Sequence, residues 1–366
     1  MKLTKINLTN FRNYDKLELN FDKNINIFIG NNAQGKTNIL ESIYVLSITK
    51  SHRTSKDLLL IKENELFTKI QGLIQDDDKE TTYEVLINEK GKKVSINDNS
   101  LKKISYYLSN INAIMFCPDD LEIIKGSPIK RRSFFNLEIS GFNNNYVKNL
   151  SEYNKLLKTR NEYLKNNNII NNDYFEILTD KLIDLNIKIY LERKKFIDDL
   201  NKYIKDIYLK ISGNNNIFIK YESFIEYNDD LKEIKYQLQN KFDRVYNNEI
   251  LNKITLLGIH RDDFSIYIDD NKINDYGSQG QHRVAILCLR LAEIELYRRE
   301  YNKKPIILLD DIFSELDKNK KNNIINYIDN DLQVFITSTD LDNIDKKIIK
   351  NADIFTIDNG KVTRGE

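Results

Sequence analysis

Eight consecutive residues near the N-terminus have the types and the spacing that bind phosphate. An apolar run at residues 25–29 precedes them, and apolar residues at helical spacing follow over residues 39–46. A loop that joins a strand to a helix aims backbone N–H groups and the positive end of the helix dipole at one point, where a triphosphate can sit. The eight residues fit G-x-x-x-x-G-K-[ST], the P-loop pattern, and are Gly30, Asn31, Asn32, Ala33, Gln34, Gly35, Lys36 and Thr37.

Two carboxylates follow a second buried strand. Residues 306–309 are apolar without interruption, which is typical of a parallel strand buried on both faces, and Asp310 and Asp311 come next. Ligands bind at the carboxyl ends of such strands. We expect Asp310 and the Thr37 hydroxyl to hold Mg²⁺, and Asp311 to orient an attacking water. Lys36 would place its charge on the β- and γ-phosphates of ATP, which makes Lys36, Asp310 and Asp311 the predicted catalytic residues.

A second turn that can bind an anion lies far along the chain. Residues 276–283 are rich in small and polar side chains, and residues 284–294 carry apolar side chains at helix spacing. A helix that starts there would offer its N-terminal N–H groups to a phosphate. A single chain needs only the P-loop to bind its own nucleotide. The predicted phosphate-binding residues of this turn are Ser278, Gln279, Gly280 and Gln281.

The elements around these motifs alternate between strand and helix patterns. We expect strands before the P-loop, at residues 2–8 and 17–21, and again within residues 65–97 and 111–116. Buried strands follow at residues 306–309 and 333–337, and two edge strands close the chain at residues 354–357 and 361–363. This order predicts an α/β fold in which both ends of the chain form one P-loop ATPase head.

The middle of the chain has a different composition. No proline occurs between Pro128 and Pro305, and apolar residues at helical steps predict one long amphipathic helix over residues 173–211. Further helices are expected at residues 143–165 and 231–254. We therefore predict a head domain of residues 1–118 and 255–366, and an inserted short helical arm of residues 119–254.

The charge is balanced overall but not locally. Lys+Arg number 56 and Asp+Glu number 55, so the whole chain does not indicate a polyanionic partner. Residues 125–165 contain nine basic and three acidic residues, a local net charge of +6. Such a stretch is either a solvated face or a surface that follows a phosphate backbone. The candidate backbone contacts are Lys130, Arg131 and Arg132.

The cysteines and the lack of long apolar runs argue against a disulfide-rich, secreted or membrane-spanning protein. Cys117 and Cys288 lie far apart in apolar surroundings, which favours two buried thiols over a disulfide or a Cys-x-x-Cys zinc site. The start lacks the apolar core of a signal peptide, and no apolar run approaches the ~18–20 residues that span a bilayer. We expect a cytoplasmic protein without a membrane partner. The segment 51–54 is either a solvated loop or a basic contact beside the nucleotide.

These motifs, in this order and over essentially the whole chain, resemble the RecF family of SMC-like ABC-type ATPases. The resemblance implies that two chains pair around two ATP molecules, with each Ser278–Gln281 turn facing the nucleotide of the other chain. It also implies binding to single-stranded DNA and to double-stranded DNA at gaps and junctions, and recombinase loading with RecO and RecR proteins in DNA repair and replication. The segments that carry it are residues 10–14, 30–37, 51–54, 117–121, 258–263, 277–281 and 306–317.

The sequence departs from general ABC heads in three places, and two of these departures bear on the expected rate of ATP hydrolysis. Asp311 stands where most heads have a glutamate, and Thr337 to Thr339 stand where a histidine usually follows the strand. The signature at residues 277–281 lacks paired glycines. The first two favour a slow, switch-like ATPase. The resemblance implies the same, a weak ATPase that DNA stimulates.

Three other functions compete with this interpretation. An ABC subunit that drives a membrane transporter predicts a shorter helical insertion and a full Gly-Gly signature. An ATP-gated nuclease needs a metal site of clustered acids and histidines, whereas the three histidines are His52, His260 and His282. A nucleotide-binding switch without turnover remains open, and phosphate release measured with and without gapped DNA separates these functions.

Overall fold

The computed structural model describes residues 1–76, 79–166, 171–213, 216–315, 321, 331–342 and 344–365. The chain forms two compact units. The head unit comprises Met1–Leu121, Tyr203–Asn215 and Gln279–Glu366, and the arm unit comprises Glu122–Lys202 and Asn216–Ser278. The domain boundaries drawn from the sequence, after residues 118 and 254, stay a prediction.

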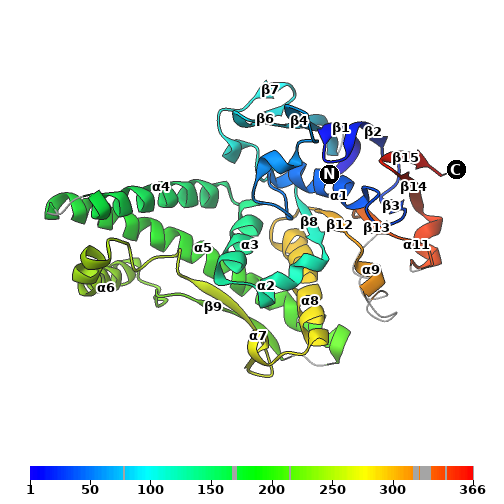
Figure 1. Cartoon of the computed structure of the whole chain (residues 1–366). Helices are drawn as coiled ribbons and strands as arrows, with labels where there is room; N and C mark the ends of the chain where they lie inside the picture. The colour runs from blue at the N-terminus through cyan, green and yellow to red at the C-terminus, as the bar shows by residue number, and fades with distance from the viewer. Residues whose placement is uncertain are drawn as a thin grey trace. The chain divides into compact units, whose positions relative to one another are not determined.

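The first sheet of the head unit brings the two ends of the chain together. Its strand order is β15-β14-β3-β13-β12-β8, and all neighbours are parallel except β14 and β15 (Figure 1). The strand β14, predicted as an edge strand, is instead an interior strand because it pairs with β3 and β15. The bounds are β3 Ile25–Ile29, β8 Ala113–Phe116, β12 Ile306–Leu309, β13 Val334–Ser338, β14 Ala352–Asp358 and β15 Lys361–Arg364.

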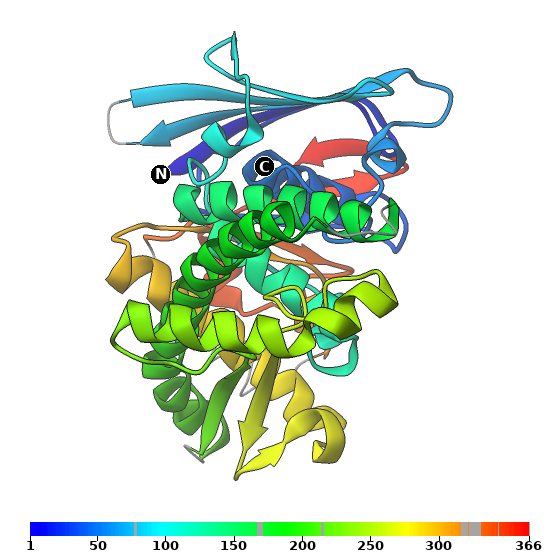
Figure 2. The ribbon, with the colours of Figure 1, turned by 90° about the vertical axis from the view of Figure 1, so that its left-hand side faces the viewer.

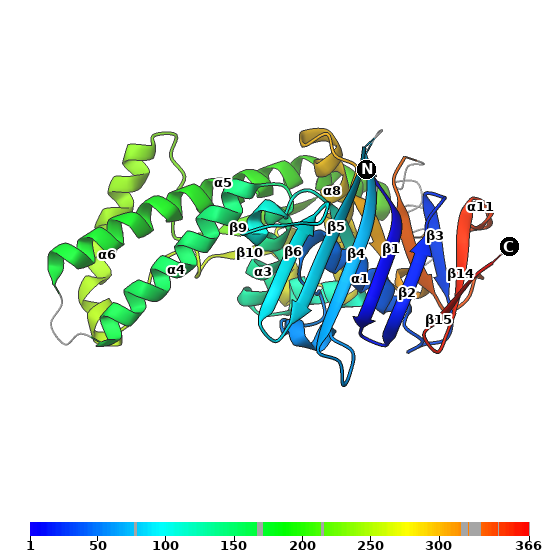
Figure 3. The same cartoon turned by 90° about the horizontal axis from the view of Figure 1, so that it is seen from above.

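The second sheet of the head unit is antiparallel and has the order β2-β1-β4-β5-β6-β7. Figure 3 shows its longer strands side by side. The sequence patterns at residues 2–8, 17–21 and 65–97 predicted these strands. The bounds are β1 Lys2–Phe11, β2 Tyr14–Asn20, β4 Phe67–Asp76, β5 Lys79–Asn88, β6 Gly91–Ile96 and β7 Asn99–Ser100.

The helix α1, Lys36–Ile48, lies between the two sheets and contacts strands of both (Figure 2). Eleven of its 13 residues are buried, which explains why its apolar pattern is not confined to one stripe. Burial on all sides fixes the helix and therefore the loop that precedes it. The other helices and 3-10 turns in the described part of the head unit are η1 Asp57–Leu60, η2 Ile104–Tyr106, η3 Pro118–Leu121, α8 Gln279–Glu300, α9 Ile312–Glu315 and α11 Lys346–Lys350.

The arm unit is built mainly from helices, as predicted. The longest, α5, runs from Asn172 to Ser212 and confirms the long helix expected over residues 173–211, although its last turns from Tyr203 belong to the head unit. A small antiparallel sheet, β11-β10-β9, completes the unit, and β9 was not predicted. The other bounds are α2 Glu122–Lys125, α3 Pro128–Ser140, α4 Asn144–Asn166, β9 Ile217–Glu222, α6 Leu231–Asn252, β10 Asp263–Ile268, β11 Asn271–Lys272 and α7 Ile273–Tyr276.

In the part of the chain that the structure describes, no helix has the length and apolar composition needed to cross a membrane.

Candidate nucleotide-binding site

The P-loop joins β3 to α1, as the sequence predicts, and two of its glycines are needed for close approach. A Cβ on Gly30 would lie 2.3 Å from the carbonyl oxygen of Ile357. Gly35 has a φ of +112°, and a Cβ there would lie 2.6 Å from the amide nitrogen of Asn13 and 2.7 Å from the hydroxyl of Tyr14. The loop is thus packed so closely that only glycine fits at its two ends.

The side chain of Lys36 is held by backbone carbonyls of the P-loop itself. Its ammonium donates to the carbonyl oxygens of Gly30 and Asn31 at 2.6 and 2.9 Å, and the residue is only 4% exposed. Gln34, at the crown of the loop, is held by the β14–β15 turn, where the backbone N–H groups of Asn359 and Gly360 donate to it. The loop and its lysine are therefore held in place by contacts within the head unit.

Thr37, in the first turn of α1, meets Asp310 at the carboxyl end of β12, although 273 residues separate them. The Thr37 hydroxyl donates to Oδ1 of Asp310 at 2.9 Å. Burial raises the pKa of Asp310, and hydrogen bonds from Thr337 and Thr37 offset part of this increase. A hydroxyl beside a carboxylate is a suitable donor set for Mg²⁺, which is usually bound by one or two carboxylates together with substrate phosphates. Among the described residues no group of three or more His, Cys, Asp or Glu side chains forms a metal site.

Thr337 links the two predicted carboxylates and was not recognised as a site residue. Its hydroxyl donates to Oδ1 of Asp310 at 2.8 Å and accepts the backbone N–H of Asp311 at 2.9 Å. Asp311 has a φ of +51°, a left-handed conformation that aspartate tolerates better than most residues. The contact arises because β13 and β12 run parallel with Leu309 paired to Ile336, so that Asp310 and Thr337 follow side by side. The signal in the sequence was that each of them follows a buried apolar run.

The turn at Ser278–Gln281 leads into α8, which begins at Gln279 and confirms the predicted helix start. The helix is fixed by a buried ion-pair network that sequence reasoning missed. Arg290 donates to both carboxylate oxygens of Asp120 at 2.6 and 3.1 Å and to Glu293 at 3.0 Å. Asp120 belongs to the segment 117–121, so this motif holds the signature helix in place.

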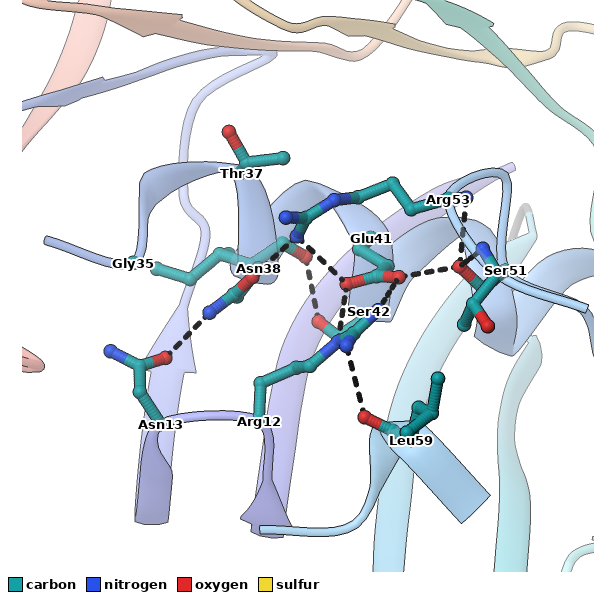
Figure 4. A network of polar contacts seen from close by, with 12 residues as sticks. Arg12, Asn13, Gly35, Thr37, Asn38, Glu41, Ser42, Ser51, Arg53 and Leu59 are labelled. Atoms are coloured by element: carbon teal, nitrogen blue, oxygen red, sulfur yellow. Dashed lines mark hydrogen bonds and ion pairs between the residues drawn. The ribbon is translucent and has the colours of Figure 1, made fainter. Parts of the chain in front are cut away.

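Two other motifs converge on Glu41 of α1 (Figure 4). Arg12 donates to both of its carboxylate oxygens at 2.9 and 2.7 Å, and the Ser51 hydroxyl donates to one of them. Burial would raise the pKa of Glu41, but the hydrogen bonds from Arg12 and Ser51 outweigh it and lower the pKa. Arg53 donates to Asn38, which follows Thr37 directly, at 2.9 Å. The segment 51–54 is therefore bonded to the P-loop helix and is not simply a solvated loop.

Comparison with known proteins gives a family for this arrangement. A family model described as the RecF/RecN/SMC N terminal domain matches residues 2–363. The chain belongs to this family. It is 38% identical to the DNA replication and repair proteins RecF of Bacillus velezensis and Bacillus subtilis, over 370 residues and 100% of each chain.

Solved structures agree with this assignment. The chain resembles a structure titled "Structure of the recombination mediator protein RecF-ATP in RecFOR pathway" with a TM-score of 0.92 and 33% identity, covering 100% of this chain and 97% of the other. An Smc head bound to the C-winged helix domain of ScpA matches with a TM-score of 0.53 and 15% identity, covering 100% and 98%, which supports the fold alone. The RecF-family chain thus has the predicted ABC-type ATPase head fold.

The candidate DNA contacts of this RecF-family chain lie in the arm unit and differ in their surroundings. Lys130 is exposed and pairs with Glu122 at 2.7 Å. Arg131 is 7% exposed and donates to both carboxylate oxygens of Asp263 at 2.7 Å, while Arg132 donates to the backbone carbonyl of Asp262. Arg131 therefore joins α3 to β10, and DNA binding by the three residues stays a prediction.

The segment 258–263 is also part of the arm interior. The Tyr153 hydroxyl lies 2.6 Å from Nδ1 of His260, and burial lowers the pKa of this histidine to about 4. Arg193, fully buried, donates to the carbonyl of Ile259 at 2.8 Å and lies 3.4 Å from the Asp262 carboxylate. This motif holds helices and strands of the arm unit together.

Proposed function

We propose that this protein is an ATP-dependent, DNA-binding recombination mediator in DNA repair and replication-fork maintenance. The observation that carries the proposal is the contact between Thr37 of the P-loop and Asp310 at the end of β12, because it brings a hydroxyl and a carboxylate that could hold Mg²⁺ together from both ends of the chain. Its similarity to RecF proteins, one of them solved as RecF-ATP, supports the choice of ATP.

The chain's own residues have separate tasks in this proposal. The P-loop from Gly30 to Thr37 binds the phosphates, and Lys36 leaves its carbonyl partners to contact the β- and γ-phosphates. Thr37 and Asp310 hold Mg²⁺, which neutralises charge on the phosphates when bound. Asp311 orients the attacking water and accepts its proton. Because aspartate is one methylene shorter than glutamate, its reach to that water is poorer, and hydrolysis is slow.

The second phosphate-binding turn gives ATP a role in assembly. Ser278, Gln279, Gly280 and Gln281 contact the nucleotide held by a second copy of the chain, so that ATP joins two chains and hydrolysis releases them. The homodimer binds single-stranded DNA and gapped or junction duplexes in the cytoplasm and acts with RecO and RecR proteins to load recombinase. Of the three candidate residues, Lys130 is the best placed for a backbone phosphate, because it is exposed whereas Arg131 is buried and Arg132 is half-buried.

The first prediction tests the nucleotide site. Lys36→Ala should weaken ATP binding by about 1.5–3 kcal/mol, since a cation is removed from the phosphates while the backbone donors stay. Titration with a fluorescent ATP analogue measures it, and Lys16→Ala, an exposed lysine on β2, is the matched control. Equal affinities of the Lys36 variant and the unmodified protein would remove the P-loop from the proposal.

Phosphate release measured in parallel, with gapped DNA and without DNA, separates the competing functions. Slow release that gapped DNA stimulates supports the mediator. ATP binding without phosphate release indicates a switch without turnover. Phosphate release at the same rate with and without gapped DNA contradicts the proposed action on DNA.

A further inference from the structure

The arm unit contains a pocket that the nucleotide chemistry does not use. It has a volume of about 300 Å³ and lies where α4, α5 and α6 meet. On α5 its lining residues follow the spacing i, i+3, i+4, i+7, which places them on one face of the helix. The pocket is lined by Arg160, Asn172, Phe175, Glu176, Thr179, Phe242, Asp243 and Tyr246.

Arg160 contributes a charge to this pocket that is already neutralised. The residue is 1% exposed, and its guanidinium donates to Glu249 at 2.6 Å, to Thr255 at 2.8 Å and to Thr179 at 3.2 and 3.3 Å. Its guanidinium carbon also lies 4.2 Å from the centroid of the Phe175 ring. Because each of its three nitrogens already donates a hydrogen bond, Arg160 is a poor anchor for an anionic ligand.

Unlike the paired guanidinium of Arg160, two carboxylates in the pocket lining are exposed and unpaired among the described residues. Glu176 on α5 and Asp243 on α6 are exposed, and neither forms an ion pair or a side-chain hydrogen bond with any residue that the structure describes. Phe175, Phe242 and Tyr246 also line the pocket, and the Arg160 guanidinium carbon lies 4.2 and 5.6 Å from the ring centroids of Phe175 and Phe242. Because Glu249 already neutralises Arg160, the two further carboxylates give the lining a net negative charge, which attracts a cation.

We propose that this pocket binds an arginine side chain of a protein partner. Its volume is at the lower end of pockets that bind small molecules and suits one long side chain. A carboxylate accepts two parallel hydrogen bonds from the planar fork of a guanidinium, which an ammonium cannot imitate. Buried aromatic residues that receive an arginine are typical of the central contacts of protein interfaces. The site needs neither ATP nor DNA, so its test is independent of the proposed function.

The test uses the full-length chain labelled with ¹⁵N and the probe acetyl-arginine-amide, followed by NMR. Acetyl-citrulline-amide is the control probe, because it has nearly the same shape without the charge. We expect arginine to shift resonances of residues at the pocket, and citrulline to shift none of them. The double variant Glu176→Gln, Asp243→Asn should weaken arginine binding about tenfold, by removing two charge-assisted contacts.

A second double variant controls for the loss of charge on the same helices. Asp184→Asn with Glu233→Gln removes one carboxylate from α5 and one from α6 away from the pocket lining, and arginine should bind it as it binds the unmodified protein. Equal binding of citrulline, arginine shifts elsewhere on the chain, or equal weakening by both double variants would each overturn the proposal. Spermidine that shifts the pocket resonances where arginine does not would identify a polyamine site and exclude the protein partner.

Discussion

At the scale of single residues, Thr337 contacts both predicted catalytic aspartates, the carboxylate of Asp310 and the backbone of Asp311. It is fully buried, it donates to Asp310 and it accepts the N–H of Asp311, whose backbone is left-handed. One hydroxyl thereby sets the direction of the carboxylate that would hold Mg²⁺ and the position of the residue that would orient water. Such outer partners commonly decide metal affinity although they never touch the metal.

The second prediction follows from this contact. Thr337→Val keeps the shape but removes the hydroxyl, so Mg²⁺ affinity in the presence of ATP should fall about 10–100-fold. Thr337→Ser retains the hydroxyl and should stay close to the unmodified protein. Titration of ATPase activity with Mg²⁺ measures both variants, and a valine variant with an unchanged Mg²⁺ requirement would contradict the role of Thr337.

The same variant has a pH signature. Burial raises the pKa of Asp310 above its ordinary value, and the Thr337 hydrogen bond lowers it. Mg²⁺ needs the ionised carboxylate, so Mg²⁺ binding is lost as the pH falls through this pKa. Because valine removes a contact that favours the ionised form, the loss should begin at a higher pH in Thr337→Val than in Thr337→Ser.

At the scale of elements, Glu41 joins the β1–β2 region and the loop after α1 to the P-loop helix. The third prediction is that Glu41→Gln lowers the free energy of unfolding at pH 7 by about 1–3 kcal/mol, since Arg12 loses its charged partner. The pKa of Glu41 is lowered in the folded protein, so its stabilisation is present above the pKa of the unfolded state and is lost as the pH falls through the folded pKa.

The stability of Glu41→Gln should therefore depend less on pH below about pH 5 than that of the unmodified protein. Urea unfolding at several pH values measures this difference. Glu18→Gln is the control, because Glu18 is exposed and its pair with Lys5 is on the surface. An equal effect of the two substitutions would show that the Glu41 network contributes no more than a surface ion pair.

The fourth prediction separates structure from DNA binding in the arm unit. Arg131→Ala breaks a largely buried pair with Asp263 and should cost about 3 kcal/mol of stability. Lys130→Ala breaks only an exposed pair and should cost less than about 1 kcal/mol. If Lys130 contacts a DNA phosphate, its removal should lower the slope of log K against log salt by about 0.9. An unchanged slope would leave Lys130 as part of a solvated face.

How much the sequence could predict depends on the range of the interactions involved. The P-loop, the long helix α5 and the buried strand before Asp310 were predictable because periodicity and motif spacing are local signals. The buried arginines were not, since Arg131 and Arg290 belong to a basic run and a helix whose patterns give no sign of Asp263 or Asp120. The strand β9 was missed because it is stabilised by pairing with β10, which lies over 40 residues away.

At the scale of the whole molecule, the two phosphate-binding turns have to be explained together. The parallel sheet joins the P-loop strand β3 to β13 and, through β13, to β12, which places Thr37 and Asp310 in contact within one chain. This contact leaves the turn at Ser278–Gln281 without a necessary task in binding the chain's own nucleotide. The Smc head shares this fold.

The fifth prediction is therefore that ATP and Mg²⁺ convert the protein from monomer to dimer. Ser278→Arg should bind ATP normally but fail to pair, because a bulky side chain fills the space for the partner's nucleotide. Asp311→Asn should trap the dimer by slowing hydrolysis, and asparagine also tolerates the left-handed backbone found there. Ultracentrifugation with and without ATP measures both variants. If the unmodified protein stays monomeric in saturating ATP, with DNA and without it, ATP does not join two chains, and the turn at Ser278 has another role.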